Sequence, residues 1–271
     1  MELILSFLTD LFDSGAGYST INTARSALST FLSKDNTPVG QLPIICRFVK
    51  GVFNLRPAIP KTKRIWDVSI VLNHLRKLAP VHSLSLKTLT LKTIMLIALL
   101  SGQRRQTLGL ISLRNITVTN DLITISFGDL LKQSRPGFQL KDISVKAYPV
   151  DRRLCPCRYL QEYIKRTKSL RKDQILFISW IKPHRAVSED TLSRWLKSVL
   201  NDAGIDLTRF SAHSIRAASS SAASAANVPI NTILDCAGWS NCGTFRKYYK
   251  KSIENTGVFA RALLHHAEQR Q

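Results

Sequence analysis

The sequence predicts a mainly α-helical protein with one small antiparallel β-sheet, divided into two domains. Along most of the chain, apolar residues recur at helical spacing. Residues 115–150 differ, because β-branched residues there alternate with polar ones, as in strands. Residues 56–64 contain two prolines and four cations, which predicts a linker between a short first part and a longer second part.

The first domain, residues 1–60, is expected to contain about three helices. Residues 2–31 carry apolar side chains at helical spacing, and Ser-Gly-Ala-Gly at residues 14–17 interrupts them, which predicts a helical hairpin. A polar stretch at residues 33–40 leads to another helix at residues 44–53.

The second domain, residues 64–271, begins with expected helices at residues 67–78 and 86–100. The second of these is almost entirely apolar, so we expect it to be buried on all sides. Residues 116–126 predict a hairpin around Asn120-Asp121, and residues 142–150 predict a further strand. Helical patterns then resume at residues 157–168, 188–200, 212–226, 229–237, 243–250 and 258–268.

The charge balance indicates a polyanionic partner. Lys and Arg number 39 against 18 Asp and Glu, a formal charge of +21, and the pI is near 10.2. Basic groups that meet phosphates release condensed counterions, so such a chain is expected to bind nucleic acid strongly at low salt. A basic surface that serves only solubility is the alternative.

Other features indicate an intracellular protein without a cofactor. The longest apolar run, residues 93–100, is too short to span a bilayer, and the N-terminus lacks the basic region of a signal peptide. Five cysteines, an odd number, favour a reducing compartment. Cys155-Pro-Cys157 has no second close pair of ligands, so we expect neither a metal nor a cofactor.

Two separate stretches place cations where no carboxylate is near in sequence. His213 and Arg216 are three residues apart in a helical pattern, so they are expected to share a helix face and to meet one anion. Arg104 follows the buried helix in Ser-Gly-Gln-Arg-Arg, which makes it a candidate phosphate ligand, with Arg105 as a lesser rival. The alternatives are a structural histidine and an arginine paired with a distant acid.

Three further segments contain candidate residues. Lys132 and Arg135 belong to Lys-Gln-Ser-Arg-Pro-Gly, a predicted turn from which a lysine could protonate a leaving oxygen if nearby cations favour its neutral form. The indole of Trp239 is a hydrogen-bond donor only. Tyr248 and Tyr249 lie among four cations that include Arg246 and Lys247, and positive charge favours the nucleophilic phenolate. A solvated lysine, a core tryptophan and DNA-stacking tyrosines are the alternatives.

The order of these motifs resembles the tyrosine recombinase family, also called phage-type integrases. Ser101-Gly-Gln-Arg104 is similar to the first arginine box of the family, Ala212-His213-Ser-Ile-Arg216 to its second box and Ala237-Gly238-Trp239-Ser240 to its His/Trp position. The resemblance covers essentially the whole chain, with the catalytic half from about residue 64. The amino-acid sequences of the motifs are most similar to those of recombinases of eukaryotic mobile elements, the DIRS-like and Crypton-like groups.

The resemblance implies a catalytic machinery. Residues 1–60 would be a core-DNA-binding domain, with truncation left open, and residues 64–271 a catalytic domain. Catalysis would use Arg104, Lys132, His213, Arg216, Trp239 and Tyr249, with Tyr248 as the alternative nucleophile, and DNA contacts would come from Arg105, Arg135, Arg246 and Lys247. The family often carries an acid three positions after the first arginine, where this chain has Thr107, so support for Arg104 must come from elsewhere.

The implied reaction is metal-independent cleavage and rejoining of DNA through a 3′-phosphotyrosyl intermediate, serving recombination or integration of a mobile element. Double-stranded DNA and further copies of the chain, from dimer to tetramer, are the expected partners, without a small-molecule substrate or a membrane. The expected location is the nucleus if the source is eukaryotic. Three alternatives stay open: a type IB topoisomerase, a DNA-binding protein that no longer cleaves, and an unrelated basic helical protein.

Overall fold

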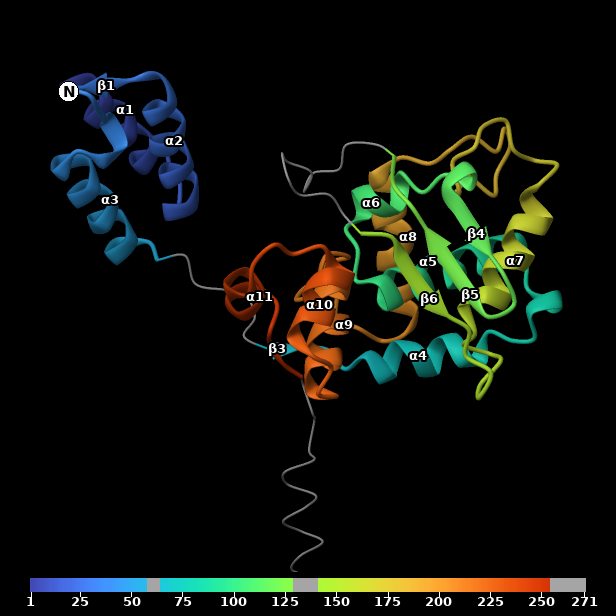
Figure 1. Cartoon of the computed structure of the whole chain (residues 1–271). Coiled ribbons are helices and arrows are strands. Elements are labelled where there is room, and N and C mark those ends of the chain that lie inside the picture. The colour runs from blue at the N-terminus through green and yellow to red at the C-terminus, as the bar shows by residue number, and fades with distance from the viewer. Residues whose placement is uncertain (58–63, 129–140, 254–271) are drawn as a thin grey trace, which may run out of the picture. The chain divides into compact units, whose positions relative to one another are not determined.

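The computed structural model describes residues 1–57, 64–128 and 141–253, and the chain separates into two compact units, Met1–Lys61 and Thr62–Gln271. Helices dominate both units and the strands are short (Figure 1), so the predicted mainly α fold with a small antiparallel sheet is confirmed. No helix in these described ranges is long and apolar enough to cross a membrane. The expected helix at residues 258–268 lies outside them.

The first unit is built from α1 (Glu2–Asp13), α2 (Tyr18–Phe31) and α3 (Pro43–Leu55), close to the predicted ranges. Between α2 and α3 lie the two-residue strands β1 (Ser33–Lys34) and β2 (Thr37–Pro38) and a 3-10 turn, which the sequence did not predict. The helices enclose a small core of Leu8, Ile21, Ile45, Val49 and Val52.

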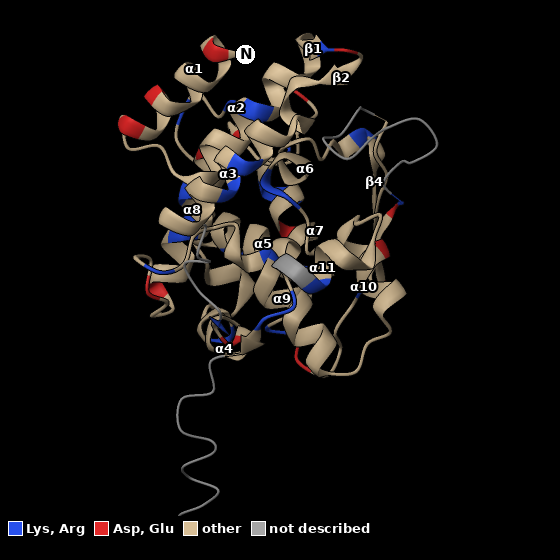
Figure 2. Cartoon of the chain, turned by 90° about the vertical axis from the view of Figure 1, so that its left-hand side faces the viewer, with Lys and Arg blue, Asp and Glu red and all other residues tan. Residues whose placement is uncertain are grey.

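Charges in the first unit are sorted by helix (Figure 2). The helix α1 carries only acidic residues, whereas α2 and α3 carry only basic ones. The basic residues are Arg25, Arg47 and Lys50. A helix pair that carries cations without acids is suited to contact a polyanion.

The second unit contains most of the helices and a three-stranded sheet. Its helices are α4 (Val68–Lys77), α5 (Leu86–Ser101), α6 (Arg105–Gly109), α7 (Pro156–Thr167), α8 (Glu189–Asp202), α9 (Ser214–Ala225), α10 (Ile230–Ala237) and α11 (Cys242–Tyr248). Its strands are β3 (Arg64–Ile65), β4 (Ile116–Val118), β5 (Leu122–Ile125), β6 (Ile143–Lys146) and β7 (Ser252–Ile253).

The helix α5 forms the centre of the second unit, as its apolar sequence predicted. It packs against α7, α8 and α9, and its residues from Leu89 to Leu99 are buried. The buried hydroxyls of Thr93 and Ser101 donate to the carbonyls of Leu89 and Ile97 one turn earlier, so these polar groups are satisfied within the helix. These buried hydroxyls therefore need no partner from another element of the unit.

The sheet has the order β4-β5-β6 and is antiparallel throughout. The predicted hairpin around Asn120-Asp121 is confirmed, but the third strand is shorter than the expected residues 142–150. Ile123, Ile125, Ile143 and Val145 are buried on the face toward the core. A parallel pair, β3 with β7, was not predicted, and it places residues 252–253, just after α11, beside the start of the unit.

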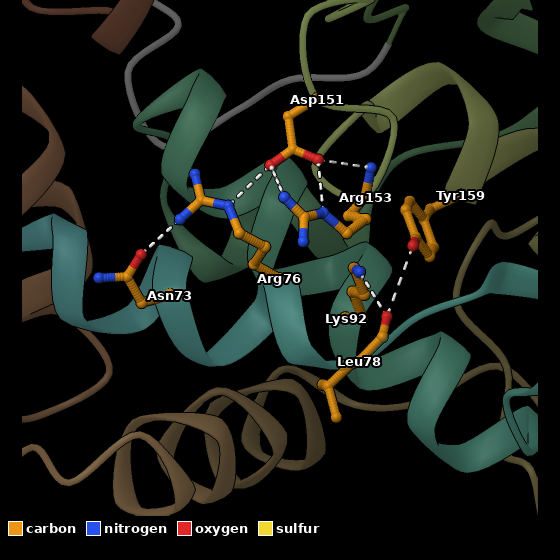
Figure 3. A network of polar contacts seen from close by, with 7 residues as sticks. All are labelled: Asn73, Arg76, Leu78, Lys92, Asp151, Arg153 and Tyr159. Carbon is orange, nitrogen blue, oxygen red and sulfur yellow. Dashed lines mark hydrogen bonds and ion pairs between the residues drawn. The ribbon is translucent and has the colours of Figure 1, made fainter.

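A fully buried lysine lies on α5. The Lys92 ammonium donates to the Leu78 carbonyl at 2.6 Å and sits 3.8 Å from the centre of the Tyr159 ring (Figure 3). Burial lowers the pKa of Lys92 to about 7, while Asp151, which is paired with Arg76 and Arg153, acts in the opposite direction. Near neutral pH this buried group therefore titrates.

We expect Lys92 to make unfolding pH-dependent. In the unfolded chain a lysine keeps its proton up to about pH 10, so between pH 7 and that value the unfolded state binds a proton that the folded state lacks. Stability should therefore rise with pH in this window, by up to about 2 kcal/mol from pH 7 to 9. Urea unfolding should show a smaller pH dependence in Lys92→Met than in the wild type. The exposed control Lys168→Met should keep the pH dependence of the wild type. The same unchanged dependence in Lys92→Met would contradict the prediction.

Candidate active site

A cleft of about 570 Å³ opens at the C-terminal end of α5 and is lined by Gln103, Arg104, Arg105, His213 and Arg216, among others. The helix α5 ends at Gly102, whose φ of +59° reverses the chain direction and favours glycine. Arg104 is the N-cap residue of the short helix α6, and its carbonyl accepts from the Leu108 N–H at 3.0 Å, which holds its backbone at the edge of the cleft. The local sequence therefore delivers two adjacent arginines beside the core.

Arg216 lies in the first turn of α9 and is 2% exposed. Its Nη1 donates to the Gly102 carbonyl at 2.8 Å, while Nε and Nη2 have no hydrogen-bond partner in the described parts of the chain. Burial, followed by repulsion from Arg104, lowers the pKa of Arg216 to about 10, and Tyr249 acts in the opposite direction. The group thus stays charged at neutral pH and keeps two donors for an anionic ligand.

Tyr249, which follows α11, brings the separate segments together. Its hydroxyl lies 3.1 Å from Nε2 of His213. Its ring centre is 4.4 Å from that of Trp239 and 5.4 Å from the Arg216 guanidinium carbon. The Ser221 hydroxyl donates to the Tyr249 carbonyl at 2.7 Å, so the backbone of this tyrosine is anchored on α9.

His213 can accept the proton of the Tyr249 hydroxyl. Partial burial of its ring, together with the charges of Arg216, Arg104, Arg105 and Lys251, lowers the pKa of His213 below its ordinary value. The imidazole is therefore neutral at pH 7, and in the tautomer with its proton on Nδ1 the Nε2 atom accepts from the phenol. This pair has the geometry of a nucleophile beside its general base.

Trp239 adds a third unused donor to the two of Arg216. The residue is 6% exposed, its ring centre lies 4.1 Å from the Arg216 guanidinium carbon, and its buried Nε1 has no acceptor among the described residues. Each buried donor without a partner costs desolvation free energy. An anion that accepts hydrogen bonds from Arg216 and Trp239 would offset this cost and explain why these donors are left unpaired.

The predicted residues thus divide into three groups. Arg104, His213, Arg216, Trp239 and Tyr249 gather around one site. Arg105 lines the same cleft but is paired there with Glu189 at 3.4 Å and Asp190 at 3.6 Å on α8, and Arg246 is exposed on α11. Lys132 and Arg135, and the side chains of Lys247 and Tyr248, lie outside the part of the chain that the structure describes.

His213 and Arg216 were expected to share a helix face and to meet one anion, and both side chains line the same cleft. His213 is the N-cap residue of α9 and has helical backbone angles, φ −66° and ψ −24°, so it lies one turn before Arg216. Its side chain is exposed, whereas Arg216 is buried, and Tyr249 contacts both. The Ser214 hydroxyl accepts from the Trp66 indole at 2.8 Å, which helps to fix this helix start.

Sequence reasoning missed the residues that support the site. Gln103 donates from Nε2 to the Cys236 carbonyl at 2.5 Å, which ties the Arg104 loop to the end of α10. Thr107, three positions after Arg104, is buried. No pattern distinguishes Ser221, which holds Tyr249, from the adjacent Ser220.

Comparison with known proteins identifies the family. A model of the phage integrase family matches residues 72–255, more than half of the chain. Among solved structures, the Tn1549 transposon integrase in complex with transposon right end DNA is similar at 14% identity, covering 97% of this chain and 84% of that one, with a TM-score of 0.63. The XerA recombinase is similar at 15% identity, covering 96% and 89%, with a TM-score of 0.53.

The XerH site-specific recombinase bound to difH is similar at 15% identity and a TM-score of 0.60; the match covers 90% of this chain, which spans 65% of the XerH chain. No curated protein matches the sequence. At these identities the structural similarity shows a shared fold, and the match over residues 72–255 shows the family. The chain therefore belongs to the phage integrase family, the tyrosine recombinases.

Proposed function

We propose that this protein cleaves and rejoins DNA strands, with Tyr249 as the nucleophile. The observation that carries the proposal is the Tyr249 hydroxyl 3.1 Å from a neutral His213, beside a buried arginine with two unused donors. Membership of the phage integrase family supports the same reaction.

In the proposed reaction the Tyr249 oxygen attacks a DNA phosphorus and His213 takes the phenol proton. A new P–O bond to tyrosine forms as the bond to the 5′ oxygen breaks, leaving a 3′-phosphotyrosyl enzyme and a 5′-hydroxyl. Arg104, Arg216 and the Trp239 N–H hold the non-bridging oxygens as negative charge builds on them. Lys132 is the proposed proton donor to the leaving oxygen. Attack by a 5′-hydroxyl on the phosphotyrosine reverses these steps and rejoins a strand.

We propose duplex DNA as the substrate and the first unit as a second DNA-binding module. The formal charge of +21 and the basic helices α2 and α3 support this, because each phosphate contact releases counterions. Several similar structures, such as the Tn1549 integrase and XerH, were solved with DNA, and one of lambda integrase is a dimer on a core site. Self-association on DNA, from dimer to tetramer, is proposed by analogy.

We further propose a role in recombination or integration of a mobile element, with action in the nucleus if the source is eukaryotic. The amino-acid sequences of the motifs, which are most similar to those of DIRS-like and Crypton-like recombinases, support this origin. A DNA-binding protein that no longer cleaves is less well supported, because Arg104, His213, Arg216, Trp239 and Tyr249 are assembled at one site.

A nicked suicide substrate tests the function. DNA drawn from the termini of the element, with a nick beside the cleavage site, should trap a covalent protein–DNA adduct, because the released fragment diffuses away and cannot religate. The adduct should form in the presence of a chelator, as the proposed chemistry uses no metal. Failure to form an adduct, or its loss in chelator, would contradict the proposal. Joining of two duplexes, rather than relaxation of supercoils alone, distinguishes a recombinase from a type IB topoisomerase.

A further inference from the structure

A second groove, of about 690 Å³, lies on another side of α8 from the active-site cleft. The cleft uses Glu189, Ser193 and Lys197 of α8, whereas the second groove uses Thr191, Arg194 and Ser198. At 3.6 residues per turn these two sets lie on opposite sides of the helix. The groove is completed by residues 179–183 and 185–188 and by Lys87, and we call it the Trp180 groove.

Two tryptophans form the apolar part of the Trp180 groove. The rings of Trp180 and Trp195 stack with their centres 4.2 Å apart and an angle of 26° between planes. Trp195 is 8% exposed, and Trp180 is half-buried. Because Trp195 covers one face of the Trp180 ring, the solvent-accessible part of that ring lies away from this face. Ile181, the next residue, is 66% exposed.

The loop that carries Trp180 is held by its own hydrogen bonds. The backbone N–H of Ser179 donates to the Arg185 carbonyl at 2.9 Å, and that of Ile181 donates to the Ser179 hydroxyl at 3.1 Å. The backbone N–H of His184 donates to the Ile181 carbonyl at 3.0 Å. A large apolar ring on a loop of fixed shape loses little conformational entropy when a ligand binds.

Positive charge surrounds the tryptophan pair. Lys87, Lys182, Arg185 and Arg194 line the groove and are exposed, and no acidic residue lines it. Within the described ranges, none of these four cations forms an ion pair, since Glu189 and Asp190 of α8 contact Arg105 instead. Cations without acids beside an aromatic ring suit a ligand that carries both phosphates and planar bases.

We propose that the Trp180 groove binds single-stranded DNA, with an unpaired base stacked on Trp180 and its phosphates against Lys182 and Arg185. Single strands are favoured over duplex DNA because paired bases are stacked inside the helix and cannot reach an indole, whereas unpaired bases stack on aromatic side chains. The choice of DNA rests on the proposed function, since cleavage and exchange of strands expose unpaired segments.

Binding should be measured in a Tyr249→Phe background, so that its result does not depend on whether the protein cleaves DNA. The probe is a fluorescent oligothymidylate of about 12 nucleotides, followed by anisotropy. Trp180→Leu should weaken its binding about 10-fold, because stacking on an indole is lost, while Trp180→Phe should retain most of the affinity. Rescue by phenylalanine separates stacking from a folding defect.

The charge contribution has its own matched control. The double variant Lys182→Ser/Arg185→Ser should reduce the salt dependence of binding by about 1.4 in log–log slope, as two phosphate contacts to a single strand are lost. Lys168→Ser/Lys172→Ser removes the same charge from exposed positions outside both grooves and should leave that slope nearly unchanged.

Duplex DNA of the same length tests whether the groove prefers single strands. Its affinity should be unchanged in Trp180→Leu. The proposal is overturned if Trp180→Leu binds the single strand as tightly as its parent, if the duplex is weakened equally, or if the control pair lowers the slope as much as the groove pair.

Discussion

Replacing Tyr249 with phenylalanine is expected to abolish the covalent protein–DNA adduct on a nicked suicide substrate, whereas Tyr248→Phe should retain it. Tyr249 places its hydroxyl 3.1 Å from His213 and packs its ring on Trp239. Removing that oxygen removes the atom that we propose forms the bond to phosphorus. Denaturing gels of the protein with labelled DNA measure the effect directly.

Tyr248→Phe is the matched control, because it makes the same chemical change one residue away among the same cations. Retention of DNA binding by Tyr249→Phe in a mobility-shift assay would show that the loss concerns bond formation. An adduct that survives in Tyr249→Phe and disappears in Tyr248→Phe would transfer the nucleophile to Tyr248.

Long helices with a clear apolar pattern could be predicted from the sequence to within a few residues. The helix α5 was expected at residues 86–100 and is found at Leu86–Ser101. It could be predicted because a helix that is buried on all sides needs a long, almost entirely apolar sequence. The two-residue strands β1, β2, β3 and β7 could not be predicted, since two residues are too short to show a period. The parallel pairing of β3 with β7 joins distant segments and has no local signal.

The residues of the candidate site could be proposed from their order along the chain, but not their contacts. Sequence spacing placed His213 and Arg216 one helical turn apart, but it could not show that Arg216 is buried while His213 stays exposed. The role of the Gly102 carbonyl as the acceptor for Arg216 is invisible in sequence, because any residue supplies a carbonyl. Arg105, a rival of Arg104 by sequence alone, is turned toward the acids of α8.

Arg216→Met should lower the rate of DNA cleavage by about 100-fold or more without lowering the melting temperature. The guanidinium is buried with two unused donors, so burying it costs desolvation free energy. An anionic ligand that accepts from these donors would offset that cost. Methionine fills similar space, sacrifices one hydrogen bond to Gly102 and removes the buried charge. Single-turnover cleavage and thermal unfolding of the same preparations measure both effects.

Arg166 is the opposite case, because each of its three side-chain nitrogens has a partner within the protein. Its Nε pairs with Glu162 at 2.6 Å, Nη1 donates to the Leu84 carbonyl at 2.6 Å, and Nη2 donates to the carbonyls of Val81 and His82 at 3.0 Å. Arg166→Met should therefore destabilise the protein by about 2 kcal/mol while the folded fraction cleaves at the normal rate. If Arg216→Met instead unfolded the protein as Arg166→Met does, its donors would be structural, and the case for a phosphate site at Arg216 would fail.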